Sequence, residues 1–276
     1  CIYEGGLLSD EYDGTIVAPN ALHNLVWNSE RIPHGSTYRT TDNPNLIDTT
    51  DRWFRPVYGG VGPDGAIYLA DWYDSRLSHV SPTDDWHKES GRIYRIAPKN
   101  VTPRYTEGDL EEKTSQELIS LFSHTNKWIR QRAAMVLGWR NDTSVVEELK
   151  KRVDQGSLES LWSLNLMDRF TKNDATKWLE NKNPNIRRWI VRLMGDRHMS
   201  LPGLAQLASK ETDIQVRSQL ASTAKRVDAA DGLAIIEGLI QHDSDAADPH
   251  LPLLIWWAIE SHCENWEAIH SFLQQH

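Results

Sequence analysis

Residues 51–72 read DRWFRPVYGGVGPDGAIYLADW, and residues 91–96 read GRIYRI. These are short strings rich in β-branched and aromatic residues, separated by turn residues, a pattern typical of consecutive antiparallel strands. Pro63 presets φ and Gly65 accepts a positive φ, so the Pro-Asp-Gly sequence predicts a tight turn. Residues 66–71 then alternate with the period-2 repeat of a strand. The whole stretch therefore predicts one blade of a β-propeller.

A single blade cannot close a ring. Propellers protect their strand edges because about four to eight blades close around a channel. Turn and strand signals also precede residue 51, including strands at residues 15–17, 22–27 and 37–41. We therefore expect residues 1–100 to form a partial β-propeller, the last blade or two of a ring. The chain is then expected to be a fragment of a longer protein.

Helical periodicity replaces the strand pattern near residue 100. Apolar residues there recur at i, i+3, i+4 and i+7, the spacing of an amphipathic helix. Stop signals such as Asn183-Pro184-Asn185 and Leu201-Pro202-Gly203 separate the segments. The predicted helices cover residues 114–122, 128–139, 145–153, 158–170, 175–179, 186–194, 204–207, 216–227, 233–240 and 251–261. The fold class is therefore mixed, β first and then α.

These helices carry an internal repeat. An acidic or amide residue, a β-branched residue and an arginine recur in the same order around Arg130, Arg187 and Arg217. A unit of about 30 residues fits a pair of antiparallel helices, and each pair buries its apolar stripe by stacking on its neighbours. We therefore predict that residues 107–276 form a HEAT-like α-solenoid. We expect the repeated arginines to be structural, bonding to carbonyls or acids of the adjacent unit.

Composition limits the classes of partner. The net charge is −9 and the sequence pI is about 5.7, which argues against a nucleic-acid ligand because phosphate binding needs a basic stripe. No apolar run reaches the ~18 to 20 residues of a membrane span. Cys1 and Cys263 have no C-x-x-C spacing, so the sequence offers no zinc, redox or haem-attachment motif. The apolar run around Trp256 and Trp257 predicts burial of both rings against a neighbouring helix.

Several of these motifs together resemble a known family. They are WFRPV (residues 53–57), GPDGAIYLADWY (62–73), His79, GRIYRI (91–96) and DPHLPLLIWWAIE (248–260). The combination is similar to the large membrane-bound dehydrogenase family of planctomycete and verrucomicrobial type. In that family a propeller related to soluble quinoprotein sugar dehydrogenases precedes HEAT repeats and then a cytochrome c domain. The likeness covers most of the chain.

The resemblance implies a cofactor site at Arg55. In quinoprotein propellers an R-x-R-D-V segment opens an inner strand, and its arginines reach the carboxylates of pyrroloquinoline quinone (PQQ). Arg55 matches the second arginine, whereas Trp53 stands at the first and Pro56 replaces the acid. The family also implies calcium beside PQQ, haem only in a cytochrome c domain outside this chain, and a periplasmic or cell-envelope location. The alternative for Arg55 is a channel-lining residue paired with a neighbouring acid.

Two further residues are candidates from their chemistry. Asp71 ends the second strand of the blade, where its carboxylate could ligate a metal or accept backbone N–H groups. His79 follows in a loop that contains His87 and several aspartates, and imidazole beside carboxylates suits a general base or a metal ligand. The alternative for His79 is a polar surface residue.

Two functions remain open on the sequence. In the first, the chain is part of a periplasmic quinoprotein-like dehydrogenase that oxidises a sugar or alcohol and passes electrons to a cytochrome c domain. The isolated fragment is then expected to be inactive, since it lacks most of a channel. In the second, the chain is a non-catalytic propeller and HEAT scaffold, and the solenoid docks a protein partner.

Overall fold

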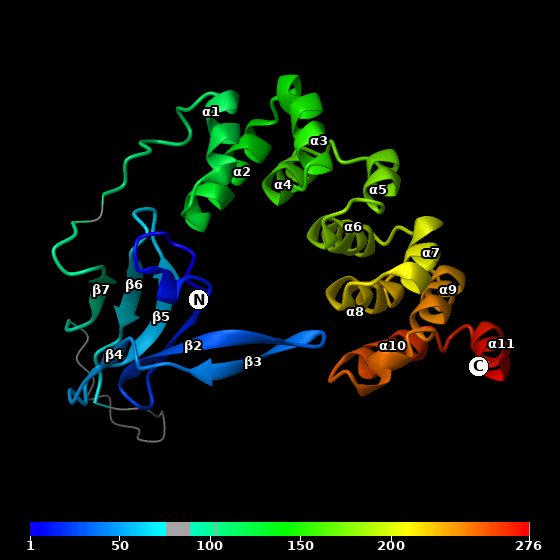
Figure 1. The fold of residues 1–276 in the computed structure, drawn as a ribbon, viewed down its shortest axis with the longest axis horizontal. Coiled ribbons are helices and arrows are strands. Elements are labelled where there is room, and N and C mark those ends of the chain that lie inside the picture. Colours follow the sequence, from blue (N-terminus) through cyan, green and yellow to red (C-terminus); the bar gives the residue numbers. More distant parts are fainter. Residues whose placement is uncertain (76–88, 103, 276) are drawn as a thin grey trace. The chain divides into compact units, whose positions relative to one another are not determined.

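The computed structural model describes residues 1–75, 89–102 and 104–275 (Figure 1). Strands come first and helices follow, so the predicted mixed β-then-α order is confirmed. The chain divides into two compact units. We call Cys1–Ile32 with Arg39–Leu137 the strand unit, and Pro33–Tyr38 with Gly138–His276 the helical unit.

Two antiparallel sheets account for the described strands. In the first, the order is β1-β2-β3, and β4 also pairs with β2; the strands are β1 (Ile16–Asn20), β2 (Leu25–His34), β3 (Thr37–Asp42) and β4 (Ile47–Asp48). In the second, the order is β5-β6-β7, with β5 (Pro56–Val61), β6 (Ile67–Asp71) and β7 (Arg92–Ile96). Pro56 lies opposite Asp71 and Val61 opposite Ile67, with an irregularity between Pro56 and Tyr58. Neither described sheet closes on itself.

The turn between β5 and β6 is the one predicted from Pro-Asp-Gly. Gly65 has a φ of 81°, and its N–H donates to the carbonyl of Gly62 at 3.0 Å. A side chain at Gly65 would place its Cβ 2.6 Å from the carbonyl oxygen of Gly5, so only glycine fits. Asp64 accepts hydrogen bonds from the Tyr68 hydroxyl (2.8 Å) and the Arg95 guanidinium (2.6 Å).

The two sheets share one hydrophobic core. It contains residues from the N-terminal segment, from β1, β2 and β6, and from the segment before β5: Tyr3, Val17, Val26, Phe54, Ile67 and Leu69. All six side chains are buried. Tyr3 also donates its hydroxyl proton to the carbonyl of Gly65 at 3.0 Å. The core therefore fixes the turn as well as the two sheets.

The strand unit also holds the first helices, α1 (Ser115–Ser120) and α2 (Lys127–Arg140) as far as Leu137. Asn126, just before α2, is 3% exposed, and its amide donates to the carbonyls of Gly62 and Pro63 at 2.9 and 3.1 Å. The ammonium group of Lys127 pairs with Glu4. The start of α2 is therefore attached to the β5–β6 turn.

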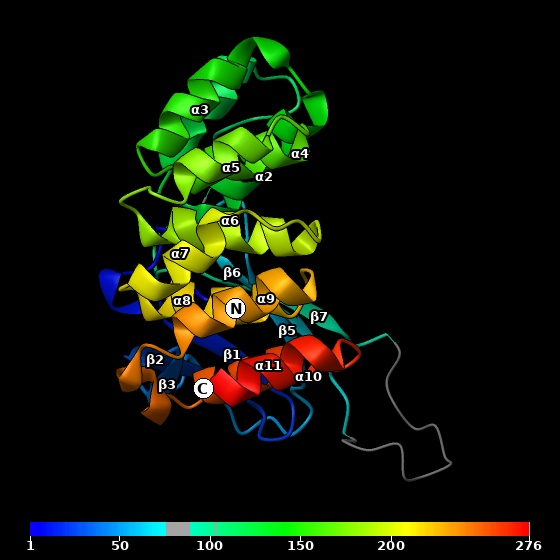
Figure 2. The same cartoon turned by 90° about the vertical axis from the view of Figure 1, so that its right-hand side faces the viewer.

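The helical unit continues with α3 (Val146–Asp154), α4 (Leu158–Leu166), α5 (Lys172–Trp178), α6 (Pro184–Asp196), α7 (Gly203–Lys210), α8 (Ile214–Ala224), α9 (Ala229–Leu239), α10 (Leu251–Glu260) and α11 (Trp266–Gln275). Alternate helices are neighbours: α6 packs on α8 and α8 on α10, while α7 packs on α9 (Figures 1 and 2). Short 3₁₀ helices lie at Asp10–Tyr12, Leu121–Ser123, Thr143–Val145 and Asp243–Ala247. Within the described helices, none has the length and hydropathy to cross a bilayer.

The repeated arginines have the structural role that the sequence predicts. Arg217 forms a two-pronged ion pair with Asp245, with Nε and Nη2 each 2.6 Å from a carboxylate oxygen. Arg187 bonds in the same manner to Glu211, at 2.7 and 2.6 Å. Burial alone would raise the pKa of Glu211, but the hydrogen bonds from Arg187 hold it below its ordinary value. Each pair therefore joins a helix, α6 or α8, to the segment that precedes the next helix but one.

A second bond completes the pattern. Nη1 of Arg187 donates to the carbonyl of Asn181, and Nη1 of Arg217 donates to the carbonyl of Glu211, in both cases six residues earlier. Arg130 makes the same bond to the carbonyl of His124 at 2.7 Å. The arginine thus closes the turn that precedes its own helix.

Candidate functional site

Arg55 and Asp71 lie together at one end of the second sheet. The backbone N–H of Arg55 donates to Oδ1 of Asp71 at 2.7 Å, and the N–H of Trp72 donates to the carbonyl of Arg55 at 2.9 Å. Because β5 and β6 are antiparallel, the start of β5 lies beside the end of β6. The sheet itself therefore brings together two residues that the sequence predicts to be functional.

The Arg55 guanidinium is buried and incompletely bonded. Its residue is 6% exposed, Nη1 donates to the carbonyl of Phe54 at 3.0 Å, and Nε is buried with no hydrogen-bond partner. No carboxylate pairs with it among the described residues. Arginine stays protonated in proteins, and a buried charge without a partner costs several kcal/mol, roughly. The side chain is therefore suited to bind an anionic group.

Asp71 holds the backbone around this arginine. Its Oδ1 accepts the N–H groups of both Arg55 and Tyr73, the latter at 2.9 Å, and Tyr73 has a φ of 49°. A left-handed conformation is strained for a bulky residue, and the hydrogen bond from Tyr73 to Asp71 helps to hold it. Oδ2 of Asp71 is buried and has no hydrogen-bond partner. Asp71 thus fits the alternative weighed for it, an acceptor of backbone N–H groups.

Calcium finds few ligands at Asp71. The ion takes roughly six to eight oxygen ligands. Among the described residues, no group of three or more histidine, cysteine or acidic side chains is placed to hold a metal ion. The metal role of Asp71 stays a prediction.

Aromatic rings surround the pair. Phe54 meets Tyr94 edge to face with centroids 5.9 Å apart, and Trp53 lies 5.7 Å from Tyr73. The guanidinium of Arg92 lies 3.8 Å from the centroid of the Tyr73 ring. Burial raises the pKa of Tyr94, and the negative charge of Asp71 raises it further. Neither Tyr73 nor Tyr94 was predicted as a site residue; Tyr73 directly follows the end of β6, whereas Tyr94 reaches this sheet position through the pairing of β6 with β7.

The third predicted site residue cannot be placed. His79, proposed as a general base, lies outside the described residues, as does His87. Their roles stay predictions that rest on the sequence.

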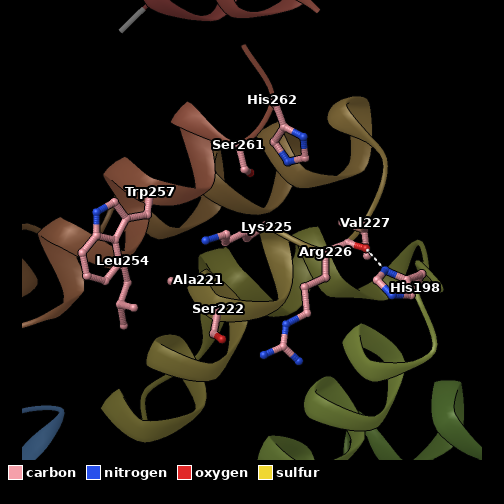
Figure 3. Close-up of a pocket in the computed structure, with 10 residues that line it drawn as sticks. All are labelled: His198, Ala221, Ser222, Lys225, Arg226, Val227, Leu254, Trp257, Ser261 and His262. Atoms are coloured by element: carbon pink, nitrogen blue, oxygen red, sulfur yellow. Dashed lines mark hydrogen bonds between the residues drawn. The ribbon is translucent and has the colours of Figure 1, made fainter. Parts of the chain in front are cut away.

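A second candidate site is a hollow of about 570 Å³ in the helical unit (Figure 3). It lies between α8 and α10 and is lined by His198, Ala221, Ser222, Lys225, Arg226, Val227, Leu254, Trp257, Ser261 and His262. Nδ1 of His198 is hydrogen-bonded to the carbonyl of Arg226 at 3.0 Å, and Nε2 of His262 to that of Ala224 at 2.9 Å. A further hollow of about 340 Å³ adjoins it along α6 and α8.

The predicted burial of the tryptophan pair is wrong. Trp257 is 45% exposed and lines the larger hollow, and Trp256 is 55% exposed. Burial on α10 falls instead on Leu251 and Ala258. An apolar run predicts a helix but cannot say which of its faces has a neighbour.

The strand region matches a known family model. Residues 1–100 match the model described as a domain of unknown function, DUF7133. The match covers both sheets together with Arg55 and Asp71, and it ends before α1. No curated protein and no solved structure matches the chain.

Proposed function

We propose that the chain is part of a quinoprotein-like dehydrogenase that oxidises a sugar or alcohol in the periplasm and passes electrons to a cytochrome c domain. In this proposal the strands are one or two blades of a β-propeller, and the helices form a HEAT-like α-solenoid. The observation that carries the proposal is the buried guanidinium of Arg55, which lacks an acid partner among the described residues.

The folded parts support the two architectural assignments. Two open antiparallel sheets with one shared core suit neighbouring blades, whose faces pack on one another around a ring. The pairs of Arg187 with Glu211 and Arg217 with Asp245 recur from one helix pair to the next. Such nearest-neighbour repetition is typical of solenoids.

PQQ fits Arg55 by its chemistry. It carries carboxylates, and a guanidinium presents a planar fork of donors that matches a carboxylate. Arg55 would hold one carboxylate through donors that are not used within the described protein, and Asp71 would fix the backbone of Arg55. When bound, the quinone supplies the chemistry by accepting the electrons of the alcohol. The protein contributes charge, position and exclusion of water.

Binding is the readout that tests this proposal. We expect residues 1–276 not to reduce a dye with added PQQ and calcium, because the described strands do not close a channel. Titration of PQQ against tryptophan fluorescence should nevertheless give saturable binding to the wild-type chain. Arg55→Gln should weaken that binding at least tenfold, whereas Arg39→Gln, an exposed residue of β3, should leave it unchanged. Absence of binding, or equal binding by Arg55→Gln, would overturn the proposal.

A non-catalytic scaffold is the second candidate, and one specific observation favours it. The helical unit carries two adjoining hollows with exposed aromatic and basic side chains, which suits a docking surface. Isothermal titration calorimetry with a partner peptide measures whether the helical unit binds a ligand or has no docking surface. An Arg55→Gln chain should bind such a peptide unchanged.

A further inference from the structure

We propose that the two adjoining hollows of the helical unit bind an extended acidic peptide segment of a partner protein, anchored by one apolar side chain. We call the two hollows together the basic groove. The inference goes beyond the dehydrogenase proposal, because none of its residues belongs to the site around Arg55.

The groove is continuous across three helices. The smaller hollow is lined by side chains of α6, α8 and α10, and the larger one by side chains of α8, α10 and the segments that follow them. Ser222 and Leu254 line both hollows. Since α6 packs on α8 and α8 on α10, the groove crosses the helices rather than following one of them. This shape suits an extended chain better than a compact ligand.

The charge of the groove is opposite to that of the chain. Arg188, Arg192, Lys225 and Arg226 line it, and no aspartate or glutamate is among its described lining residues. One nearby carboxylate, that of Asp196, is shared by Arg226 at 2.5 Å and Arg192 at 3.5 Å. Four basic side chains thus line the groove, and Asp196 pairs with two of them, on a protein whose net charge is −9.

Two of these cations are available to a ligand. Arg188 and Lys225 form no ion pair with any described residue. Lys225 is exposed and follows the last residue of α8 (Figure 3). A carboxylate of the partner can therefore pair with either of them without breaking an existing bond, and the protein loses no internal contact on binding.

Two histidines bond to carbonyl groups at and after the end of α8. His262 is hydrogen-bonded to the carbonyl of Ala224, and His198 to that of Arg226. A helix C-terminus carries partial negative charge, which repels an anion, and these two bonds offset part of that repulsion.

Aromatic side chains supply an anchor. The exposed ring of Trp257 lies beside Leu254 in the larger hollow, where it can cover an apolar side chain of the partner. In the smaller hollow Trp189 packs edge to face on Trp162, and Arg192 lies 5.2 Å from the Trp189 ring. Arg192 is thus held over an aromatic face and oriented for an anion.

Polar side chains between the two ends suit a peptide backbone. Gln215, Ser218, Gln219 and Ser222 line the smaller hollow, and amides and hydroxyls can both donate and accept hydrogen bonds. Nucleic acid is the competing polyanion, but it needs a longer basic stripe and would be repelled by the rest of this acidic chain. The combination of charge, apolar anchor and mixed hydrogen bonding favours an acidic peptide.

Fluorescence anisotropy with a labelled peptide tests the proposal. The probe is a short peptide rich in aspartate and glutamate with one central phenylalanine, titrated with residues 1–276 at low and at physiological salt. The double variant Arg188→Glu with Lys225→Glu should weaken binding at least tenfold, and Trp257→Ala at least fivefold. All three residues are at least partly exposed, so the variants should fold.

Matched controls come from the same unit. Trp256→Ala removes a somewhat more exposed ring of α10 that lines neither hollow, and Lys210→Glu reverses an exposed charge on α7. Neither should change the dissociation constant more than twofold. Absence of binding, equal weakening by the controls, or tighter binding of single-stranded DNA or anionic vesicles than of the peptide would overturn the proposal. Loss of PQQ binding in the Arg55→Gln chain would leave this result untouched.

Discussion

Two arginines of this protein are buried to the same extent and are hydrogen-bonded very differently. Arg217 in the helical unit and Arg55 in the strand unit are each 6% exposed. Arg217 uses Nε and both terminal nitrogens, bonding to the two carboxylate oxygens of Asp245 and to a carbonyl. Arg55 donates from Nη1 to the carbonyl of the preceding residue, and its Nε has no partner. Burial is therefore no guide to role, whereas completeness of bonding is.

The difference follows from what each side chain does for folding. A buried ion pair in which every guanidinium nitrogen is bonded holds neighbouring parts of the helical unit together, and its removal damages the fold. An arginine with unused donors contributes little to folding, because the energy of burying its charge is not recovered from the described protein. Arg217 is therefore structural, whereas the unused donors of Arg55 are the basis for proposing that it binds a ligand.

The largest loss of stability should come from removing Asp245, the acid partner of Arg217. Asp245→Ala leaves the Arg217 charge buried without its partner, and we expect a loss of about 3–5 kcal/mol in the free energy of unfolding. Urea denaturation followed by tryptophan fluorescence measures it. Asp243→Ala is the matched control, since Asp243 is exposed in the same 3₁₀ helix and should change stability by less than about 0.5 kcal/mol. Similar losses in both variants would show that the ion pair does not stabilise the repeat.

The helices and the structural role of Arg217 were predicted well from the sequence. All ten predicted helices are present, because stops such as Asn183-Pro184 and the 3.6-residue spacing act locally. The recurring arginine indicated a structural bond before any acid partner could be named. Its partners, Glu211 and Asp245, lie 24 and 28 residues further on, so only stacking of the repeats identifies them.

The errors at helix ends have local causes. The helix predicted to run to residue 170 ends at Leu166, and Asp168 has a φ of 53°, which a helix cannot accommodate. The last helix, Trp266–Gln275, was not predicted, and Ile269 is its buried residue. Its apolar residues Trp266, Ile269 and Leu273 recur at helical spacing, so the signal was present in the sequence and the prediction overlooked it.

The candidate site was only partly predictable. Arg55 and Asp71 were both named, but their contact depends on the pairing of β5 with β6 and on the irregularity near Val57. The groove residues were missed, because single basic residues on three separate helices have no common spacing in the sequence. Their meeting in one groove is a consequence of helix packing.

An effect of intermediate size is expected at Asp248, whose carboxylate accepts hydrogen bonds from backbone N–H groups. Burial alone would raise the pKa of Asp248, but hydrogen bonds from the Ser36 hydroxyl and from the backbone N–H groups of Ser36, His250 and Leu251 lower it to about 2 from 3.8. A depressed folded-state pKa means that this stability is present above pH about 4 and is lost as pH falls towards 2.

The Ser36→Ala variant tests that carboxylate. It removes one donor to Asp248, and we expect a loss of about 1 kcal/mol at pH 5 to 7. The difference from wild type should shrink as pH falls from about 4 towards 2, where the carboxylate becomes protonated in both chains. Thermal unfolding across this pH range measures it, with Ser209→Ala as the control because its hydroxyl bonds to the carbonyl of Gln206. A difference that stays constant with pH would contradict the charged hydrogen bond.

The smallest loss of stability should come from the unpaired arginine, and it is the sharpest test of the comparison. Arg55→Met keeps the apolar stem and removes a buried charge that lacks an acid partner among the described residues, so the free energy of unfolding should stay the same or rise. Arg217→Met is the matched variant, and it should cost about 3–5 kcal/mol because it leaves Asp245 buried and unpaired. Urea denaturation of both variants gives the two values. Equal losses would mean that Arg55 is held by a structural partner, and a ligand would then no longer be needed to explain its burial.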